Sequence, residues 1–397
     1  MANAFVSTSS SSLGGTSGSA GLVQAAYDRL LEFALRSEPL IRSVADKTPA
    51  RQSIPGSTVV LQRYVDLAQN TTALTETTDP DAVAMSTPTN VSITLAEYGN
   101  SVLVTRALEL FSLADVDPAI ANIIAFNLAD SIDAIAMETL RGGTYKIFGG
   151  SATSTGTVAA SSTLDSADIR KAVAKLRSAK AIGRKGSLYW AGIHPEVSHD
   201  LRAESSSGQG WLLPNQYGSS QDRIWAGEIG NYEGAYYVES ARLYNAKTGA
   251  DQTALATASA VSGASGAFTI VAANAAFGGR AEVGDKISGT NVGSSAKITA
   301  ISVGATNTTY TVDVANSGTV GTNTLTVTPV TRVYNTIVCG QQAMAQAVAE
   351  EPHTVIGPVV DKLMRHRPMG WYGVLGFARY REEALYRIET GSSIAAL

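Results

Sequence analysis

The chain has 397 residues, a formal net charge of −4 and a charged fraction of only 16%. This mildly acidic balance argues against a protein that coats nucleic acid, because binding to phosphates needs clustered lysine and arginine. The one cysteine, Cys339, excludes a disulfide framework within the chain, and we expect it to be buried in a strand. No run of about 18 apolar residues is evident, so we expect no membrane-spanning segment.

Residues 1–21 are rich in serine, glycine and threonine and contain no lysine or arginine, which predicts a flexible arm that does not bind nucleic acid. The stretch also lacks the basic and apolar regions of a signal peptide, so we expect the protein to fold in a cytoplasm. Apolar residues then recur with helical spacing from Leu22 to about Arg36, before Pro39. We predict a short helix there.

An extended two-stranded arm is predicted next. Residue types favour a strand over Thr58–Val65, and alternating apolar residues favour a second strand over Val91–Leu95. The stretch between them, which includes Asn70–Pro80, is polar and rich in turn-forming residues. Such an arm buries little surface by itself. It makes physical sense if it lies on another surface, such as a neighbouring subunit.

Two helices follow the arm. Asp117 and Pro118 are a favourable N-cap and first helical residue, and apolar residues then recur at three- and four-residue steps as far as Leu140. The helix predicted over Pro118–Leu140 is about 35 Å long at ~1.5 Å per residue. An amphipathic pattern predicts a second helix over Ser166–Lys180, whose cationic face we interpret as solvated.

The rest of the chain is predicted to be mainly β structure. Residues Leu188–Ile193 favour a strand that leads into a short helix through His199, and Ile224–Tyr237 favours turn-rich β structure. From residue 246 to 331 few side chains are charged and short alternating runs recur, which predicts a small β barrel or sandwich inserted into a parent domain. Further strands, expected to pack on the long helix, are predicted over Trp371–Phe377 and Ala384–Ile388.

Catalytic and metal-binding motifs are not found. The sequence has no nucleophile elbow, no phosphate-binding loop and no zinc-ligand spacing. His194 and His199 stand five residues apart, which does not place both on one face of a helix, so structural histidines are the better interpretation. We therefore expect neither an enzyme nor a bound cofactor.

Charged groups in two loops could instead contact another subunit. The carboxylates of Glu76, Asp79 and Asp81 could pair with basic groups on a neighbour, and Arg365 and Arg367 could meet a carboxylate or DNA. Solvated loops are the competing interpretation for both clusters, because isolated surface ion pairs contribute little. Further candidates for a subunit interface lie where the predicted arm begins: Arg51, Arg63 and Tyr64.

Several short stretches of the chain stand in an informative order. They are Tyr27–Leu31, Arg51–Gly56, Leu74–Pro80, Glu97–Asn100, Ala129–Asp133, Gly227–Gly230 and Gly370–Gly373. In this order they resemble the major capsid protein family named for coliphage N-four. The likeness covers most of the chain outside residues 246–331.

The resemblance implies an α+β chain with the Hong Kong 97-type phage capsid fold and an added all-β domain. The implied parts are an N-terminal arm with a short helix (1–51), an E-loop that reaches over an adjacent subunit (52–97), a peripheral domain (98–189 and 346–397) with a spine helix (118–140), an axial domain (190–245 and 332–345) and an inserted β domain that projects outward (246–331).

By the same resemblance, we expect the chain to form hexamers and pentamers of an icosahedral shell, assembled in the bacterial cytoplasm around phage double-stranded DNA that it binds non-specifically. Scaffolding, portal and cement proteins are further expected partners, and no membrane is expected. Some shells of this fold carry a crosslink from an E-loop lysine, but residues 52–105 contain no lysine, which excludes it here. The alternative is a phage tail or surface adhesin whose β module binds a glycan or protein.

Overall fold

The computed structural model describes most of the chain in two compact units. The described residues are 39–49, 57–64, 66–71, 73–74, 76–77, 82–106, 116–203, 228–358, 363 and 365–394. The smaller unit takes its described residues from 100–126 and 354–371, and the larger unit takes them from 36–99, 127–353 and 372–397. The predicted N-terminal arm and first helix lie outside the described residues, as do Arg51, Asp79 and Asp81.

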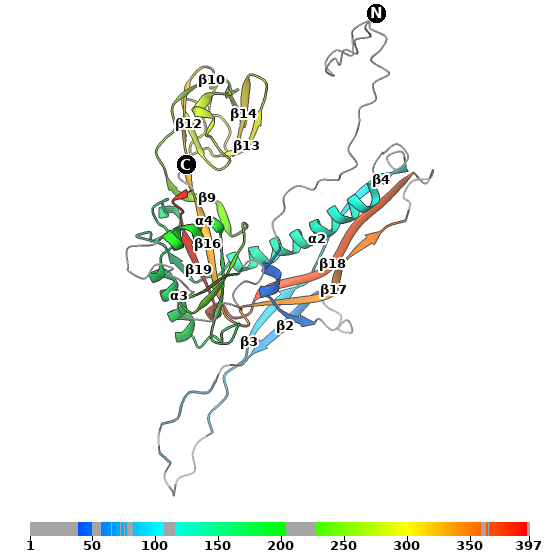
Figure 1. Ribbon diagram of the computed structural model, residues 1–397, viewed down its shortest axis with the longest axis vertical. Helices are drawn as coiled ribbons and strands as arrows, with labels where there is room; N and C mark the ends of the chain where they lie inside the picture. The colour runs from blue at the N-terminus through cyan, green and yellow to red at the C-terminus, as the bar shows by residue number, and fades with distance from the viewer. Residues whose placement is uncertain are drawn as a thin grey trace, which may run out of the picture. The chain divides into compact units, whose positions relative to one another are not determined.

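Strands β2 (Thr58–Arg63) and β3 (Thr89–Thr94) pair antiparallel along their whole length, which confirms the two predicted strands (Figure 1). In β3 the apolar Val91 and Ile93 alternate with polar residues and are the more buried side chains. In β2 the burial also alternates, but the exposed face includes the apolar Val60. Ile93 is fully buried in a small cluster with Ala345 and Ala347. The pair is therefore fixed to the rest of the larger unit at this end.

Helix α2 (Val116–Arg141) confirms the long helix predicted over Pro118–Leu140. One face of its C-terminal half is buried, since Ile132, Ala136 and Leu140 follow one another at four-residue steps and have no exposed surface. This face shares a core cluster with Ala384 and Leu385. The prediction that the C-terminal strand packs on the long helix is confirmed by that cluster.

One helix bears on the expectation that no segment of the chain spans a membrane. Among the described residues one helical window, Ile120–Arg141, has the length and composition to cross a membrane, with a mean hydropathy of 1.4. Aspartate and asparagine interrupt its apolar run, but isoleucine, leucine and alanine keep the average high. The core helix of a folded protein passes the same test, and the buried face of α2 has that character.

The larger unit is built on a seven-stranded sheet in the order β5-β19-β16-β6-β8-β7, with β9 also paired to β16. The strands are β5 (Lys146–Phe148), β6 (Tyr189–Ile193), β7 (Glu228–Tyr232), β8 (Ala235–Glu239), β9 (Tyr244–Asp251), β16 (Val330–Cys339) and β19 (Leu385–Thr390). Helices α3 (Ser166–Ser178) and α4 (Pro195–Ala203) share an apolar core with this sheet. These elements confirm the strand predicted over Leu188–Ile193, which is β6, and the two shorter predicted helices, which are α3 and α4.

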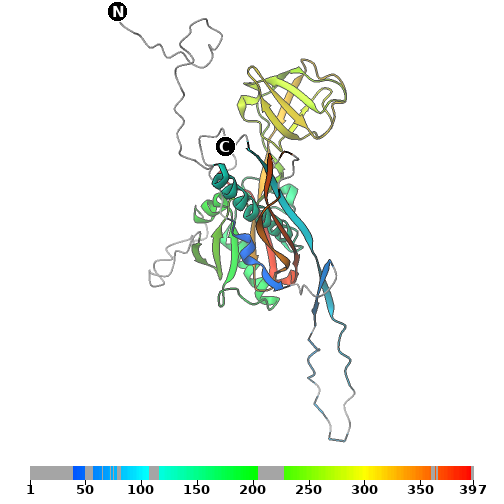
Figure 2. The ribbon, with the colours of Figure 1, turned by 90° about the vertical axis from the view of Figure 1, so that its right-hand side faces the viewer.

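A second sheet is formed by the strands between β9 and β16, in the order β12-β15-β10-β11-β14-β13. They are β10 (Ala258–Ser262), β11 (Thr269–Ala273), β12 (Lys286–Gly289), β13 (Ile298–Val303), β14 (Asn307–Val312) and β15 (Thr324–Thr328). The two edge strands, β12 and β13, are joined by backbone hydrogen bonds. The N–H of Ile287 donates to Ala296 O and the N–H of Ile298 donates to Asp285 O, each at 2.9 Å. The sheet thus closes into a barrel, drawn in yellow in Figure 2, around its own apolar core.

A four-stranded sheet has the order β1-β17-β18-β4. Its strands are β1 (Asp46–Pro49), β4 (Ala96–Thr105), β17 (Met344–Ile356) and β18 (His366–Arg379), and the remaining elements are the short helices η2 (Ile41–Val44), η3 (Thr155–Thr157), η5 (Ala276–Gly279) and η6 (Glu382–Ala384). On β18, a Cβ added at Gly376 would collide with the carbonyl oxygen of Thr94. Only glycine permits this close approach of β18 to the end of β3.

Candidate functional site

The segment between β2 and β3 presents large apolar side chains to solvent. Those described are 56 to 76% exposed: Tyr64, Leu67, Leu74, Val83 and Met85. None of its described residues is buried, and the only structure assigned to them is a turn at Glu76 and Thr77. Exposed apolar side chains gathered on one element can form a contact surface, and we call residues 64–88 the arm loop.

Sequence analysis selected the charged members of this loop and missed its apolar ones. A signal was available, since leucine, valine and methionine recur within an otherwise polar, turn-rich stretch. The predicted candidate Glu76 is exposed at the turn, and the Tyr64 hydroxyl donates only to Gln62, at 3.4 Å. The described part of the arm loop is therefore a mixed surface, with both charged and large apolar side chains exposed.

Arg63, another predicted interface residue, is engaged within its own chain. Its guanidinium donates to both carboxylate oxygens of Glu383, at 3.0 and 3.3 Å. Through this bond the pKa of Arg63 is raised and that of Glu383 is lowered. The pair fixes the base of the arm loop, and Arg63 is not available to a neighbour unless this bond breaks.

The predicted basic cluster lies in the smaller unit at the start of β18. The carbonyl oxygen of Arg365 accepts the N–H of Arg106 at 2.9 Å, which pairs the backbone next to β4, while the Arg365 side chain is exposed. Arg367 is half-buried. Of these two interface candidates, Arg365 is the more exposed.

Asp133 on α2 is a structural residue that sequence analysis noted only as part of a motif. Its carboxylate is fully buried, and one oxygen accepts the N–H groups of Ile41 at 2.6 Å and Arg42 at 3.0 Å. The other oxygen lies 3.6 Å from the guanidinium of Arg242, which also pairs with Asp130. Burial raises the pKa of Asp133 despite the bonds from the backbone. The carboxylate thereby anchors the N-terminal segment, at η2, to the long helix.

Residues that could have carried chemistry have structural surroundings. Cys339 is buried in β16, as predicted, and burial raises the pKa of its thiol to about 12. The ring of His194 packs 4.8 Å from that of Tyr334, and burial lowers the pKa of His194. Within the described part of the chain, no group of three or more His, Cys, Asp or Glu could hold a metal ion.

Comparison with known proteins rests on structure alone. No protein-family model matches the sequence, and no curated protein matches it at a significant level. The capsid protein of cyanophage P-SCSP1u matches with a TM-score of 0.59 and 12% identity over 94% of each chain. The capsid protein of Ralstonia phage GP4 matches with a TM-score of 0.57 and 12% identity over 97% of this chain and 98% of the other. The capsid protein of cyanophage Pam1 matches with a TM-score of 0.54 and 13% identity over 96% of this chain and 100% of the other. The chain therefore has the fold of phage capsid proteins.

Proposed function

We propose that this chain is the major capsid protein of a tailed double-stranded DNA phage and assembles into the hexamers and pentamers of an icosahedral shell. The observation that carries the proposal is the arm loop, whose apolar side chains have no core of their own and gain burial only against another surface. The likeness to phage capsid structures over nearly the whole chain supports it. A structural function also agrees with the surroundings of Cys339 and His194.

We assign the parts of the capsid fold to residues of this chain as follows. Residues 52–97 act as the E-loop that overlaps an adjacent subunit, and residues 118–140 act as the spine helix. The axial domain around the local symmetry axis contains residues 190–245 and 332–345. To these we add β5 and β19, because they pair in the same sheet as β6 and β16. The barrel is the inserted domain, since β9 and β16 flank it and pair with each other.

Non-covalent burial would hold the shell together. Residues 52–105 contain no lysine, so the E-loop cannot supply the amine of an isopeptide crosslink. Burying one Leu or Met side chain contributes about 1.5–3 kcal/mol, so a few such groups per arm loop stabilise a subunit contact substantially. Scaffolding, portal and cement proteins are the further partners of such a shell.

Electron microscopy of the chain expressed with its assembly partners tests the proposal. The variant Leu67→Asp/Leu74→Asp should abolish closed particles without changing the melting temperature of the unassembled chain, because both side chains are exposed there. Val283→Asp/Val303→Asp is the matched control, since these barrel side chains are 52% and 72% exposed, against 56% and 71% for Leu67 and Leu74. Particles that form normally from the arm variant would contradict the assignment of the arm loop. A chain that never enters particles would contradict the proposed function.

Deletion of the barrel separates this proposal from the adhesin alternative. Residues 252–329 begin and end beside each other, because the N–H of Gln252 donates to Pro329 O at 2.8 Å, so a short linker can replace them. A capsid protein should still assemble without the barrel. An adhesin should instead lose its binding activity when the barrel is deleted, and it should form no particles with or without the barrel.

A further inference from the structure

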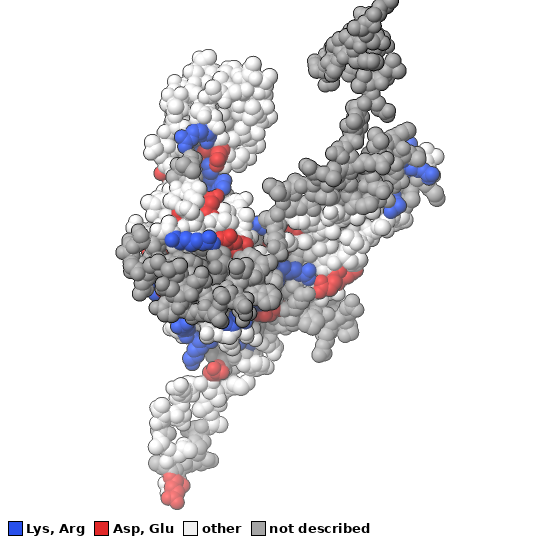
Figure 3. All heavy atoms as spheres, viewed as in Figure 1, with Lys and Arg blue, Asp and Glu red and all other residues white. Residues whose placement is uncertain are grey.

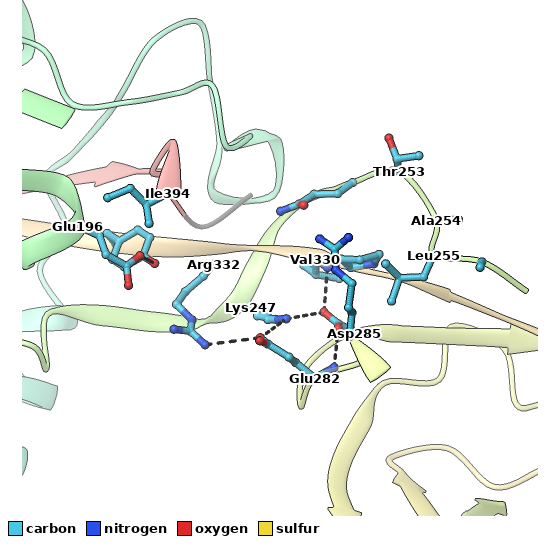
Figure 4. Close-up of a pocket in the computed structure, with 15 residues that line it drawn as sticks. Glu196, Lys247, Thr253, Ala254, Leu255, Glu282, Asp285, Val330, Arg332 and Ile394 are labelled. Carbon is cyan, nitrogen blue, oxygen red and sulfur yellow. Dashed lines mark hydrogen bonds and ion pairs between the residues drawn. The ribbon is translucent and has the colours of Figure 1, made fainter. Parts of the chain in front are cut away.

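A polar cleft of about 670 Å³ lies between the barrel and strands β9 and β16 (Figure 4). Its walls come from the turn before β12, from Lys247 on β9, from Arg332 on β16 and from the segment Gln252–Ala256 that leaves β9. Sites that bind ligands typically enclose roughly 300–1,000 Å³ with a few convergent polar groups. The cleft is in that range and belongs to none of the surfaces described above.

One wall of the cleft is fixed by a buried ion pair. The ammonium of Lys247 lies 2.7 Å from Asp285 and 2.8 Å from Glu282. Asp285 is fully buried and also accepts the N–H of Val330 at 3.2 Å. Bonding to Lys247 lowers the pKa of Glu282. These contacts join the barrel to β9 and β16, so the cleft is formed before any partner arrives.

Two guanidinium groups in the cleft are poorly neutralised. Arg332 lies 3.9 Å from Glu282, a carboxylate that Lys247 already binds more closely, and its guanidinium stacks 5.4 Å from the ring of Tyr244. Arg280 is exposed, and no carboxylate within the described residues pairs with it. Arginine binds carboxylates through two parallel N–H bonds. The third carboxylate of the cleft, Glu196, accepts the hydroxyl of Tyr334, so the cleft holds three carboxylates and three cations. Because Lys247 is bound by Glu282 and Asp285, the two arginines are the cations left to bind acidic groups.

The segment Gln252–Ala256 adds unpaired backbone. It is held through two N–H groups, those of Gln252 and Leu255, which donate to Pro329 O and Val327 O at 2.8 Å. The N–H groups of Thr253, Ala254 and Ala256 have no partner in the described part of the chain, and all three residues are exposed. Free N–H donors of this kind can bond the backbone carbonyl oxygens of another chain.

Charge on the barrel is concentrated near this cleft. The charged residues between 252 and 329 are Arg280, Glu282, Asp285, Lys286, Lys297 and Asp313. The first three line the cleft, while most of the barrel surface in Figure 3 is white. Arg280 is the barrel cation that lines the cleft, whereas Lys286 and Lys297 are not part of its lining.

We propose that this cleft docks an extended acidic segment of a second protein, whose carboxylates bond Arg280 and Arg332 while its backbone pairs with Gln252–Ala256. A peptide is favoured because its backbone carbonyl oxygens can accept from these N–H groups while its carboxylates reach the arginines. The site stands whether or not the chain builds a shell, since all its walls belong to one chain. In a shell, the partner would be a protein that attaches beside the barrel.

A yeast-displayed library of random decapeptides, sorted against the full-length chain, tests the site. The enriched peptides should carry two or more Asp or Glu. Their affinity should fall at least tenfold when those residues become Asn or Gln, and when the chain carries Arg280→Gln/Arg332→Gln. Lys297→Gln, which removes a barrel cation that does not line the cleft, should change affinity less than twofold. N-methylation of alternate peptide bonds should also weaken binding, because it removes donors from the paired backbone.

Three results would overturn the site. The first is a library without enriched binders, and the second is enrichment of neutral or basic peptides. The third is binding that the double arginine variant leaves unchanged. If polygalacturonate binds the chain and Arg280→Gln/Arg332→Gln abolishes that binding while no peptide does so, the cleft recognises an acidic glycan and the peptide proposal is wrong. Particle assembly by the double arginine variant separates any of these failures from a failure of the capsid proposal.

Discussion

Removal of the Asp133 carboxylate should detach the N-terminal segment from the long helix. Asp133→Ala leaves two N–H groups, those of Ile41 and Arg42, without their acceptor in a buried place. Each unsatisfied buried donor costs about 1–3 kcal/mol, and Arg242 loses one of its two carboxylates. Because the variant also removes the cost of burying a charge, we expect a net loss of about 2–4 kcal/mol in the free energy of unfolding.

Urea denaturation of the unassembled chain, followed by tryptophan fluorescence, measures this loss. Trp190 lies in the same core cluster as Ile41 and Val44, so it reports on the detachment. Limited proteolysis should cut the variant between residues 39 and 46 faster than it cuts the parent. A loss below about 0.5 kcal/mol, the usual size for surface substitutions, would refute the assignment of Asp133 as the anchor.

Asp133→Asn keeps an oxygen for both N–H groups, so it should cost only about 1 kcal/mol, and its cost should depend on pH. Burial raises the pKa of Asp133 above its unfolded value of about 3.9. The stabilisation from the proton is therefore complete below that value and is lost as the pH rises through the folded pKa. The parent protein loses this proton-linked stabilisation between pH 4 and pH 7, whereas Asp133→Asn has no such group to titrate. The free energies of unfolding of the two proteins should therefore differ less at pH 7 than at pH 4. An equal difference at both values would count against a raised pKa.

Other predictions concern packing and exposure. Gly376→Ala should lower the free energy of unfolding by about 1–3 kcal/mol through collision with Thr94, whereas Gly156→Ala, where the space is open, should be nearly neutral in the same urea titration. Cys339, buried and with its thiol pKa raised to about 12, should react with Ellman's reagent only after unfolding; rapid labelling of the native chain would show that the thiol is accessible. Arg63→Ala should cost less than about 1 kcal/mol because its pair with Glu383 is partly exposed, and a larger shift in the urea midpoint would mean that the base of the arm loop is more tightly coupled to the core.

Local pattern determined the elements of this chain. Alternation of apolar residues predicted β3, and three- and four-residue spacing predicted α2 and α3, because burial of one face depends mainly on the order of nearby residues. The short alternating runs after residue 246 likewise predicted the strands of the barrel. Motif order also led from the sequence to a capsid-type fold, which the structural comparisons support.

Only the tertiary structure decided which distant groups meet. Asp133 finds its partners 92 and 91 residues away, and Arg63 finds Glu383 320 residues away, and no local pattern contains those separations. The same holds for the closure of the barrel and for the cleft beside it, whose walls come from β9, β16 and the turn before β12. The exposure of the arm loop was also decided by the tertiary structure. Whether an apolar residue is buried depends on which other parts of the fold lie next to it. Sequence proximity sets the elements, and long-range packing sets the surfaces on which function depends.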